Sequence, residues 1–207
     1  METYGTFEHV VDAFVEFANT VPFYGAVVAC IDDKHVAAML PRVRRRVVTY
    51  GFAESADVRA LAPSTDGRRG QADVVFRIPQ HPDGAGRGAL TVNVPGLHNL
   101  QNALAAVAVG IELGVPFPSI AAALAEFRGA DRRFQLKGQV DGVTVIDDYG
   151  HHPTEIGAVL AAARAGQPAR IIAAFQPHRF TRSRDLMAEF GAVLAGAIGM
   201  LRNAEHD

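Results

Sequence analysis

Four ionisable side chains lie within six consecutive positions of the sequence: Asp147, Asp148, His151 and His152. The apolar run before them predicts a strand over residues 143–146, and the proline that follows them is typical of the first residue of a helix. Strand ends and helix starts are the places where α/β proteins bind phosphate and carboxylate groups. A single such residue could simply cap the turn or the helix, but four ionisable groups together favour a ligand site.

A second, cationic group follows the next strand that we expect, over residues 170–175. It contains His178, Arg179 and Arg182, and the two arginines are about one helical turn apart, so that both guanidinium groups can face one anionic ligand. A right-handed crossover between two parallel strands would bring both strand ends to the same edge of a sheet. We therefore expect this group to meet the Asp148 motif in one pocket. The alternative is a solvated helix start with surface arginines.

Two further motifs consist of amides and arginines. His98, Asn99 and Asn102 lie at the start of an expected helix, where amide groups one turn apart can read the edge of a nucleotide base. Capping of that helix by Asn99 is the alternative. Arg132 and Arg133 follow a glycine-containing linker, where an arginine can reach a phosphate as two domains close, or can form an ordinary basic surface pair.

The first part of the chain has the pattern of an α/β domain. Apolar residues at helical spacing predict a helix over residues 7–17, and short apolar runs predict parallel strands over 26–31 and 47–52 with a helix between them. Turns at Pro82-Asp83-Gly84 and Gly86-Arg87-Gly88 predict an antiparallel extension of the sheet. The strands of that extension are expected over residues 58–61, 72–78 and 89–94. The apolar face of the next helix consists of Leu100, Ala103, Leu104, Val107 and Ile111.

We place a domain boundary after Gly129, so that the two domains span residues 1–129 and 130–207. The second domain is expected to contain, in order, a hairpin turned at Asp141-Gly142, a helix from Pro153, a strand over 170–175 and a helix over 181–197. No strand is expected after Leu201, which leaves a thin sheet with two parallel strands.

Composition excludes several classes of protein. The 207 residues carry a formal net charge of -2 and 49% of them are hydrophobic, which is ordinary for a globular protein and predicts neither a nucleic-acid nor a membrane partner. The single cysteine, Cys30, cannot form a disulfide within the chain, which fits a reducing cytoplasmic setting, and its apolar neighbours predict a buried side chain. The start of the chain has no signal-peptide pattern, and no apolar run reaches the roughly 20 residues of a membrane helix.

Together the four motifs resemble the Mur ligase family. The pattern Gly96-x-His98-Asn99-x-x-Asn102 is similar to the family's helix at the adenine of ATP, and three other segments are similar, in order and spacing, to the branch that adds L-alanine to UDP-N-acetylmuramate. Those segments are Arg132–Gln135, Asp147–Glu155 and Phe175–Arg182. The resemblance implies a Mur ligase-like central domain, with a mostly parallel sheet and an antiparallel extension, followed by a truncated Rossmann-like C-terminal domain.

The resemblance also implies an activity in peptidoglycan biosynthesis. ATP would phosphorylate the lactyl carboxylate of UDP-N-acetylmuramate, and the amine of L-alanine would attack the acyl phosphate, with Mg²⁺ and cationic side chains offsetting the negative charge. The implied nucleotide-binding residues are His98, Asn99 and Asn102. The implied catalytic residues are Arg132, Asp148 and His151. The implied residues for L-alanine and the muramoyl carboxylate are Tyr149, His151, His178, Arg179 and Arg182.

The family's phosphate-binding loop, G-x-x-x-x-G-K-[ST], does not occur in these 207 residues. Lys34 and Lys137 are the only lysines, and neither follows a glycine. The resemblance places the nucleotide-sugar domain and the magnesium ligands of the family before Met1, and the last strands of the C-terminal domain after Asp207. We therefore expect a fragment that cannot catalyse ligation alone.

Three alternatives remain at this stage. The chain could belong to the related recycling ligase that adds a whole peptide to the same nucleotide sugar. It could be a metal-dependent phosphohydrolase with Asp147, Asp148, His151 and His152 as ligands, although adjacent residues on a strand point to opposite faces, which hinders Asp147 and Asp148 from sharing one ion. It could also be a non-catalytic remnant that still binds nucleotide.

Overall fold

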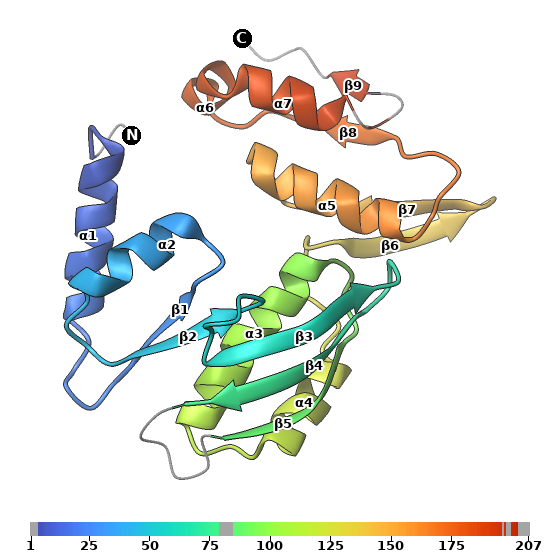
Figure 1. Cartoon of the computed structure of the whole chain (residues 1–207). Coiled ribbons are helices and arrows are strands. Elements are labelled where there is room, and N and C mark those ends of the chain that lie inside the picture. Colours follow the sequence, from blue (N-terminus) through green and yellow to red (C-terminus); the bar gives the residue numbers. More distant parts are fainter. Residues whose placement is uncertain (1–3, 79–84, 196, 198–199, 203–207) are drawn as a thin grey trace. The chain divides into compact units, whose positions relative to one another are not determined.

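The computed structural model describes residues 4–78, 85–195, 197 and 200–202 of the chain (Figure 1). The expected turn at Pro82-Asp83-Gly84 lies outside these described residues. The chain forms two compact units, and each draws on separate stretches of sequence. The first contains residues 1–63, 71–91 and 100–125, and the second contains residues 64–70, 92–99 and 126–207. The expected domain boundary after Gly129 stays a prediction.

The expected β-helix-β order is present at the start of the chain. Helix α1 (Phe7–Asn19) precedes strand β1 (Val27–Cys30), and β1 pairs in parallel with β2 (Val47–Gly51). Helix α2 (Lys34–Met39) and a 3-10 turn connect the two strands. The Asp33 carboxylate caps α2 by accepting hydrogen bonds from two backbone N–H groups at 2.8 and 3.0 Å. Cys30 is half-buried, so its side chain is less buried than its apolar neighbours predict.

Helix α1 forms where its periodicity predicts, but the structure leaves much of its apolar surface uncovered. Phe14 and Phe17 are 58% and 72% exposed, whereas Val15 and Ala18 are buried. Helical spacing of apolar residues identifies a helix, but it does not determine which part of the apolar surface other elements will cover.

The larger sheet is mixed, as expected, with strand order β1-β2-β3-β4-β5. Strand β3 (Val58–Thr65) pairs in parallel with β2. A four-residue turn joins β3 to β4 (Gly70–Arg77), and a connection that short requires an antiparallel pair. The Arg77 N–H accordingly donates to the Asp57 carbonyl, at 2.7 Å, beside the start of β3.

The turn expected at Gly86–Gly88 is wrong, because strand β5 begins earlier and spans Ala85–Val92. The two glycines lie in the strand, where aromatic rings occupy the space of their missing side chains. A Cβ at Gly86 would be 2.5 Å from the Phe76 ring, and one at Gly88 would collide with the Phe117 ring. Glycine here marks a close approach inside a strand and not a turn.

Helix α3 (Leu97–Glu112) buries the face that the sequence predicts, and α4 (Phe117–Glu126) follows it. Its buried residues are Leu100, Ala103, Leu104, Val107, Ala108 and Ile111. At its end, the Glu112 carboxylate accepts two hydrogen bonds from the Arg46 guanidinium, one of them at 2.7 Å. This half-buried ion pair fixes the end of α3 to the chain just before β2. Within the described ranges, no helix is both long and apolar enough to cross a bilayer.

The second unit contains an antiparallel hairpin of β6 (Gln135–Val140) and β7 (Val143–Asp147). Both residues of its turn, Asp141 and Gly142, have positive φ angles of 49° and 78°, as the Asp-Gly pair predicts. The hairpin exposes most of its apolar side chains, including Leu136, Val140, Val143 and Val145.

The remaining elements correct three expectations. Strand β8 (Ala173–Phe175) pairs in parallel with β9 (Met200–Arg202), so a strand does follow the last helix. Strands β7 and β8 belong to different two-stranded sheets, because β7 takes its sequence neighbour β6 as partner across the tight turn. The expected helix over 181–197 is two helices, α6 (Phe180–Asp185) and α7 (Met187–Leu194), since Leu186 between them has non-helical dihedral angles.

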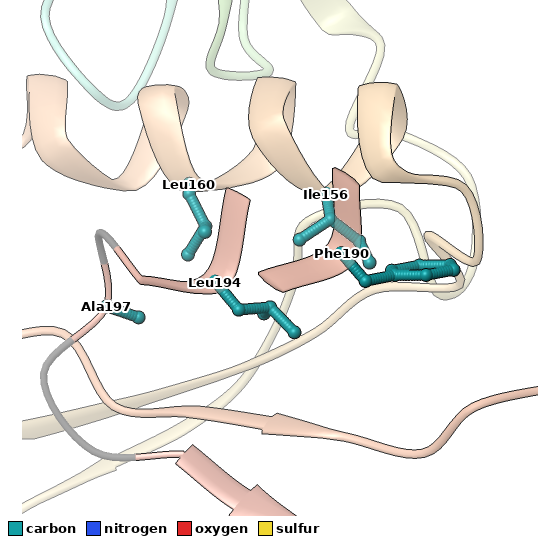
Figure 2. Close-up of a cluster of buried hydrophobic side chains, with 5 residues drawn as sticks. All are labelled: Ile156, Leu160, Phe190, Leu194 and Ala197. Atoms are coloured by element: carbon teal, nitrogen blue, oxygen red, sulfur yellow. The ribbon is translucent and has the colours of Figure 1, made fainter. Parts of the chain in front are cut away.

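Helix α5 (Pro153–Ala165) packs against α7 and builds the core of the second unit (Figure 2). Figure 2 shows the α5 side chains Ile156 and Leu160 facing those of Phe190 and Leu194 from α7. The Phe175 ring stacks on Phe190 with ring centroids 5.2 Å apart, which joins β8 to this core. The cluster therefore holds together the helix that follows the Asp148 motif and the strand that precedes the cationic group.

The core of the first unit gives a direct test. Leu104 on α3 is fully buried, whereas Leu113, just past the same helix, is 74% exposed. We expect Leu104→Ala to lower the free energy of unfolding by about 2–5 kcal/mol, because it removes buried methyl groups and leaves a cavity. Leu113→Ala should change it by less than about 0.5 kcal/mol. Urea unfolding followed by circular dichroism measures both, and equal losses would contradict the assignment of this core.

Candidate functional site

Asp148 is held in one orientation by two backbone N–H groups. Its Oδ2 accepts a hydrogen bond from the Phe134 N–H at 2.8 Å, and its Oδ1 accepts one from the Gly150 N–H at 2.6 Å. The Tyr149 N–H donates to the Arg132 carbonyl at 2.7 Å. The bond to Gly150 is the turn-capping role considered above, whereas the bond to Phe134 joins segments 14 residues apart. The loop after β7 and the segment before β6 are therefore one connected structure.

A capping box starts α5. The His152 Nδ1 accepts a hydrogen bond from the Thr154 N–H at 3.3 Å, and the Glu155 Oε2 accepts from the N–H groups of His151 and His152 at 3.0 and 3.2 Å. The capping interpretation of His152 is therefore confirmed, and its Nδ1 carries no proton in this arrangement. The N–H groups of His151 and His152, just before the helix, are thus occupied by Glu155 and not free for a phosphate group.

Glu155 connects this cap to the basic residues around it. Arg133 Nη1 lies 3.7 Å from its Oε1, and His151 Nδ1 lies 3.7 Å from its Oε2. Burial raises the pKa of Glu155, but the hydrogen bond from the His151 N–H and the charges of His151 and Arg133 outweigh burial and lower that pKa overall. Glu155 is therefore an ionised partner for the cationic side chains of the site.

Arg132, Tyr149 and His151 form a row of contacting groups. The Arg132 guanidinium carbon lies 4.8 Å from the centre of the Tyr149 ring, a cation–π distance. The Tyr149 and His151 rings meet edge to face with centroids 5.2 Å apart. Arg132 Nε also lies 3.7 Å from Asp147 Oδ2, and the arginine side chain is more than half exposed. The structure thus brings Arg132 together with Tyr149 and His151, which belong to a different sequence motif, and leaves the guanidinium group accessible.

The asparagines at the start of α3 differ in their contacts. Asn99 Nδ2 donates a hydrogen bond to the Pro95 carbonyl at 2.7 Å. The side chain therefore binds a carbonyl four residues earlier in the chain and does not cap a helical N–H group. The capping alternative for Asn99 is therefore wrong. The same bond fixes the amide orientation and leaves Oδ1 as the group that can accept. Asn102, one turn further along, is exposed.

His98 lies in the second unit, in the electrostatic environment of Asp148 and Arg133. Burial lowers the pKa of His98, and the positive charge of Arg133 lowers it further, whereas the negative charge of Asp148 acts in the opposite direction. Gly96, with φ of 95°, makes room for this ring, since a Cβ there would lie 2.6 Å from His98 Cε1. Positive φ and close approach together explain why this position is a glycine.

The cationic group after β8 stands apart from these contacts. His178 and Arg179 are exposed, Arg182 is half-buried, and Arg179 has φ of 67° just before α6. Among the described residues, no hydrogen bond or ion pair joins this group to Asp148 or His151. The shared sheet that was expected to bring the two motifs together is absent from the described elements, because β7 and β8 have different partners. Convergence of the two groups stays a prediction.

The acidic and histidine cluster does not have the geometry of a metal site within the described part of the chain. There, no group of three or more His, Cys, Asp or Glu side chains is placed to hold one ion. Asp147 faces Arg132, whereas both oxygens of Asp148 accept backbone hydrogen bonds. The two neighbouring carboxylates thus have separate partners.

Sequence reasoning did not predict the ion pair between Arg133 and Glu155, or the hydrogen bonds that Glu155 and the Phe134 N–H make with predicted site residues. A signal for Glu155 was available, because an N-cap residue followed three positions later by Glu is the capping-box pattern. Histidine at the N-cap, in place of serine or threonine, obscured it. The bond from Phe134 to Asp148 spans 14 positions, and no local pattern encodes such a contact.

Two family models match the chain in consecutive segments. The model described as Mur ligase middle domain matches residues 1–110, and the one described as Mur ligase, glutamate ligase domain matches residues 132–204. The chain belongs to the Mur ligase family. The resemblance noted from the four motifs is thereby confirmed, and the mixed sheet and smaller second sheet agree with the fold class that it implied.

This Mur ligase chain is 51% identical over 197 residues to the UDP-N-acetylmuramate–L-alanine ligase of Koribacter versatilis, an alignment that covers 95% of this chain and 42% of the relative. The UDP-N-acetylmuramate–alanine ligase structure from Thermotoga maritima is 27% identical, with a TM-score of 0.74, over 96% of this chain and 41% of that one. MurF from Acinetobacter baumannii, at 20% identity and a TM-score of 0.80 over 96% of this chain and 43% of its own, shares the fold. The chain thus spans about two fifths of the length of these Mur ligases.

Asp148 and Asp147 form a matched pair for a stability test. Asp148→Asn places an amide N–H₂ group against a backbone N–H donor, and we expect it to lower the free energy of unfolding by about 1–3 kcal/mol. Asp147→Asn weakens a single long, exposed ion pair and should cost less than about 0.5 kcal/mol. Urea unfolding of both variants measures the difference. A larger loss for Asp147→Asn would show that Asp148 does not organise the loop.

The lowered pKa of Glu155 predicts a pH dependence with a definite sign. A carboxyl group whose pKa is lower in the folded state stabilises the fold above its unfolded pKa, and this contribution is lost as the pH falls through the folded value. Wild type should therefore exceed Glu155→Gln in stability at neutral pH, and the difference should narrow once the pH is below 4.5. Unfolding free energies of the two proteins across this pH range provide the measurement. A difference that widens on acidification would contradict the role of Glu155.

Proposed function

We propose that this chain carries the middle and C-terminal parts of a cytoplasmic, ATP-dependent ligase that joins L-alanine to UDP-N-acetylmuramate in peptidoglycan biosynthesis. The observation that carries the proposal is the 51% identity, over 95% of the chain, to a relative with that name. The geometry around Asp148 and at the start of α3 supports it residue by residue.

The proposed nucleotide-binding residues are Asn99 and Asn102, with His98 beside them. Because Asn99 Nδ2 is engaged with the Pro95 carbonyl, its Oδ1 is the atom offered to a ligand. Adenine presents an amine donor at N6, which is the complement of that acceptor. Asn102 is exposed one turn further along the same helix, where a second amide can contact the same base.

We assign the chemistry at the ATP side to Arg132 and Asp148. The Arg132 guanidinium is more than half exposed, and its planar donors suit phosphate oxygens. Each Asp148 oxygen accepts one backbone hydrogen bond and keeps a further acceptor position for a hydroxyl group. His151, held next to Tyr149 by an edge-to-face ring contact, lies in the same row of groups.

The substrate-binding residues of the proposal are Tyr149, His151, His178, Arg179 and Arg182. Their cationic members match the carboxylates of L-alanine and of the muramoyl group. In the proposed reaction, an oxygen of the lactyl carboxylate attacks the γ-phosphorus of ATP, and ADP leaves. The amine of L-alanine then attacks the acyl carbon of the resulting acyl phosphate and loses a proton, and inorganic phosphate leaves as the amide forms. Cationic side chains stabilise the oxyanion of the tetrahedral intermediate.

We infer that the 207 residues alone do not complete this reaction. No glycine precedes either lysine, and the sequence contains no G-x-x-x-x-G-K-[ST] pattern, whose lysine and backbone N–H groups hold the β- and γ-phosphates in enzymes of this kind. The described residues provide no carboxylate and histidine group arranged to hold Mg²⁺, so we assign no magnesium ligand here. The loop that binds the β- and γ-phosphates is therefore not among these residues.

Isothermal titration of the purified chain with ATP and magnesium tests the nucleotide assignment. We expect ATP to bind, and Asn99→Ala to weaken binding about fivefold because one hydrogen bond to the base is lost. Inorganic tripolyphosphate is the control, since its affinity should be the same for wild type and variant. Equal ATP affinities would contradict the base assignment, and ATP-dependent formation of UDP-N-acetylmuramoyl-L-alanine by the chain alone would contradict its inactivity.

A further inference from the structure

Asp32 joins three elements of the first unit. It directly follows Ile31 at the end of β1, and its carboxylate accepts backbone hydrogen bonds from the N–H groups of Phe52, at 2.8 Å, and Ala53, at 2.9 Å, just past β2. The same carboxylate accepts a hydrogen bond from Gln101 Nε2 on α3 at 2.5 Å. The carboxyl ends of two parallel strands and the first turns of α3 therefore meet at one side chain.

The hydrogen-bonding groups around Asp32, which we call the Asp32 junction, determine how the Gln101 amide is oriented. A carboxylate only accepts hydrogen bonds, so the Gln101 amide must face it with its N–H₂ group. Gly51 makes space for the contact, because a Cβ at that position would lie 2.5 Å from Asp32 Oδ1. The neighbouring Asp33 has a separate task, since its carboxylate binds the N–H groups of His35 and Val36 and caps α2. Capping therefore does not account for Asp32.

We propose that Asp32 is a positioning residue for nucleotide binding: through Gln101 it holds the start of α3, and with it Asn102, at a fixed place relative to the carboxyl ends of β1 and β2. Gln101 and Asn102 are adjacent on the helix, so a shift or rotation of its first turns would carry Asn102 with it. The inference rests on the proposed function in one respect, namely that Asn102 contacts the base.

Amide hydrogen exchange of the whole chain tests the positioning without any ligand. We expect Asp32→Ala and Gln101→Ala each to increase exchange at the amides of residues 101–104 by about fivefold, the effect of losing one hydrogen bond of ordinary strength. The double variant should exchange no faster than either single variant, because both changes remove the same contact. Asp33→Ala is the matched control and should affect α2 and leave α3 unchanged. Unchanged exchange in α3 of Asp32→Ala would overturn the proposal.

Titration with ATP and magnesium then separates positioning from mere stabilisation of the fold. Asp32→Ala should weaken ATP affinity about fivefold when Asn102 is present, and should have a smaller effect in the Asn102→Ala background, where Asn99 is the remaining amide at the base. If Asn102→Ala weakens binding and Asp32→Ala does not, the positioning role is wrong and the proposed function stands. If ATP does not bind, or binds Asn102→Ala as tightly as wild type, the base assignment fails and the inference falls with it, while the exchange data still report on the junction itself.

Discussion

The two backbone hydrogen bonds to Asp148 are the constraint on which the candidate site depends. The bond from Phe134 fixes the loop after β7 against the segment before β6, and the bond from Gly150 closes the turn within that loop. The segment before β6 includes two bulky residues, Arg132 and Phe134, with positive φ. Each such residue costs of order 1–3 kcal/mol and persists only where surrounding contacts hold it. The row of Arg132, Tyr149 and His151 exists because those contacts bring the three residues together.

Sequence alone was most informative where a pattern is local. Helical spacing located α3 and its buried face, Asp141-Gly142 located the hairpin, and the β-helix-β order located the first parallel pair. It failed where the outcome depends on competition between distant partners. Strand β8 pairs with β9 and not with β7, and nothing in the apolar run of a strand states which distant partner it will take.

The same contrast between local patterns and distant partners holds for the candidate site. Residue types chosen for their chemistry, such as Asp148, Arg132 and His151, do lie close together. Their relation to His178, Arg179 and Arg182 was inferred from a shared sheet, and that premise did not hold. Glu155 was missed because its role is to accept hydrogen bonds from backbone N–H groups, and the capping-box pattern that indicates this role has histidine here in place of the usual serine or threonine.

The β6–β7 hairpin has a consequence for the behaviour of this chain in concentrated solution. It is a two-stranded sheet with Leu136, Val140, Val143 and Val145 exposed. Apolar strands with open edges are templates on which further strands of other molecules add, a route to aggregation that is independent of the buried cores. Lys137 and Asp141, the charged residues between these apolar positions, oppose such association by charge repulsion. The colloidal stability of the chain therefore depends on the β6–β7 hairpin, which contributes little to the cores of the fold.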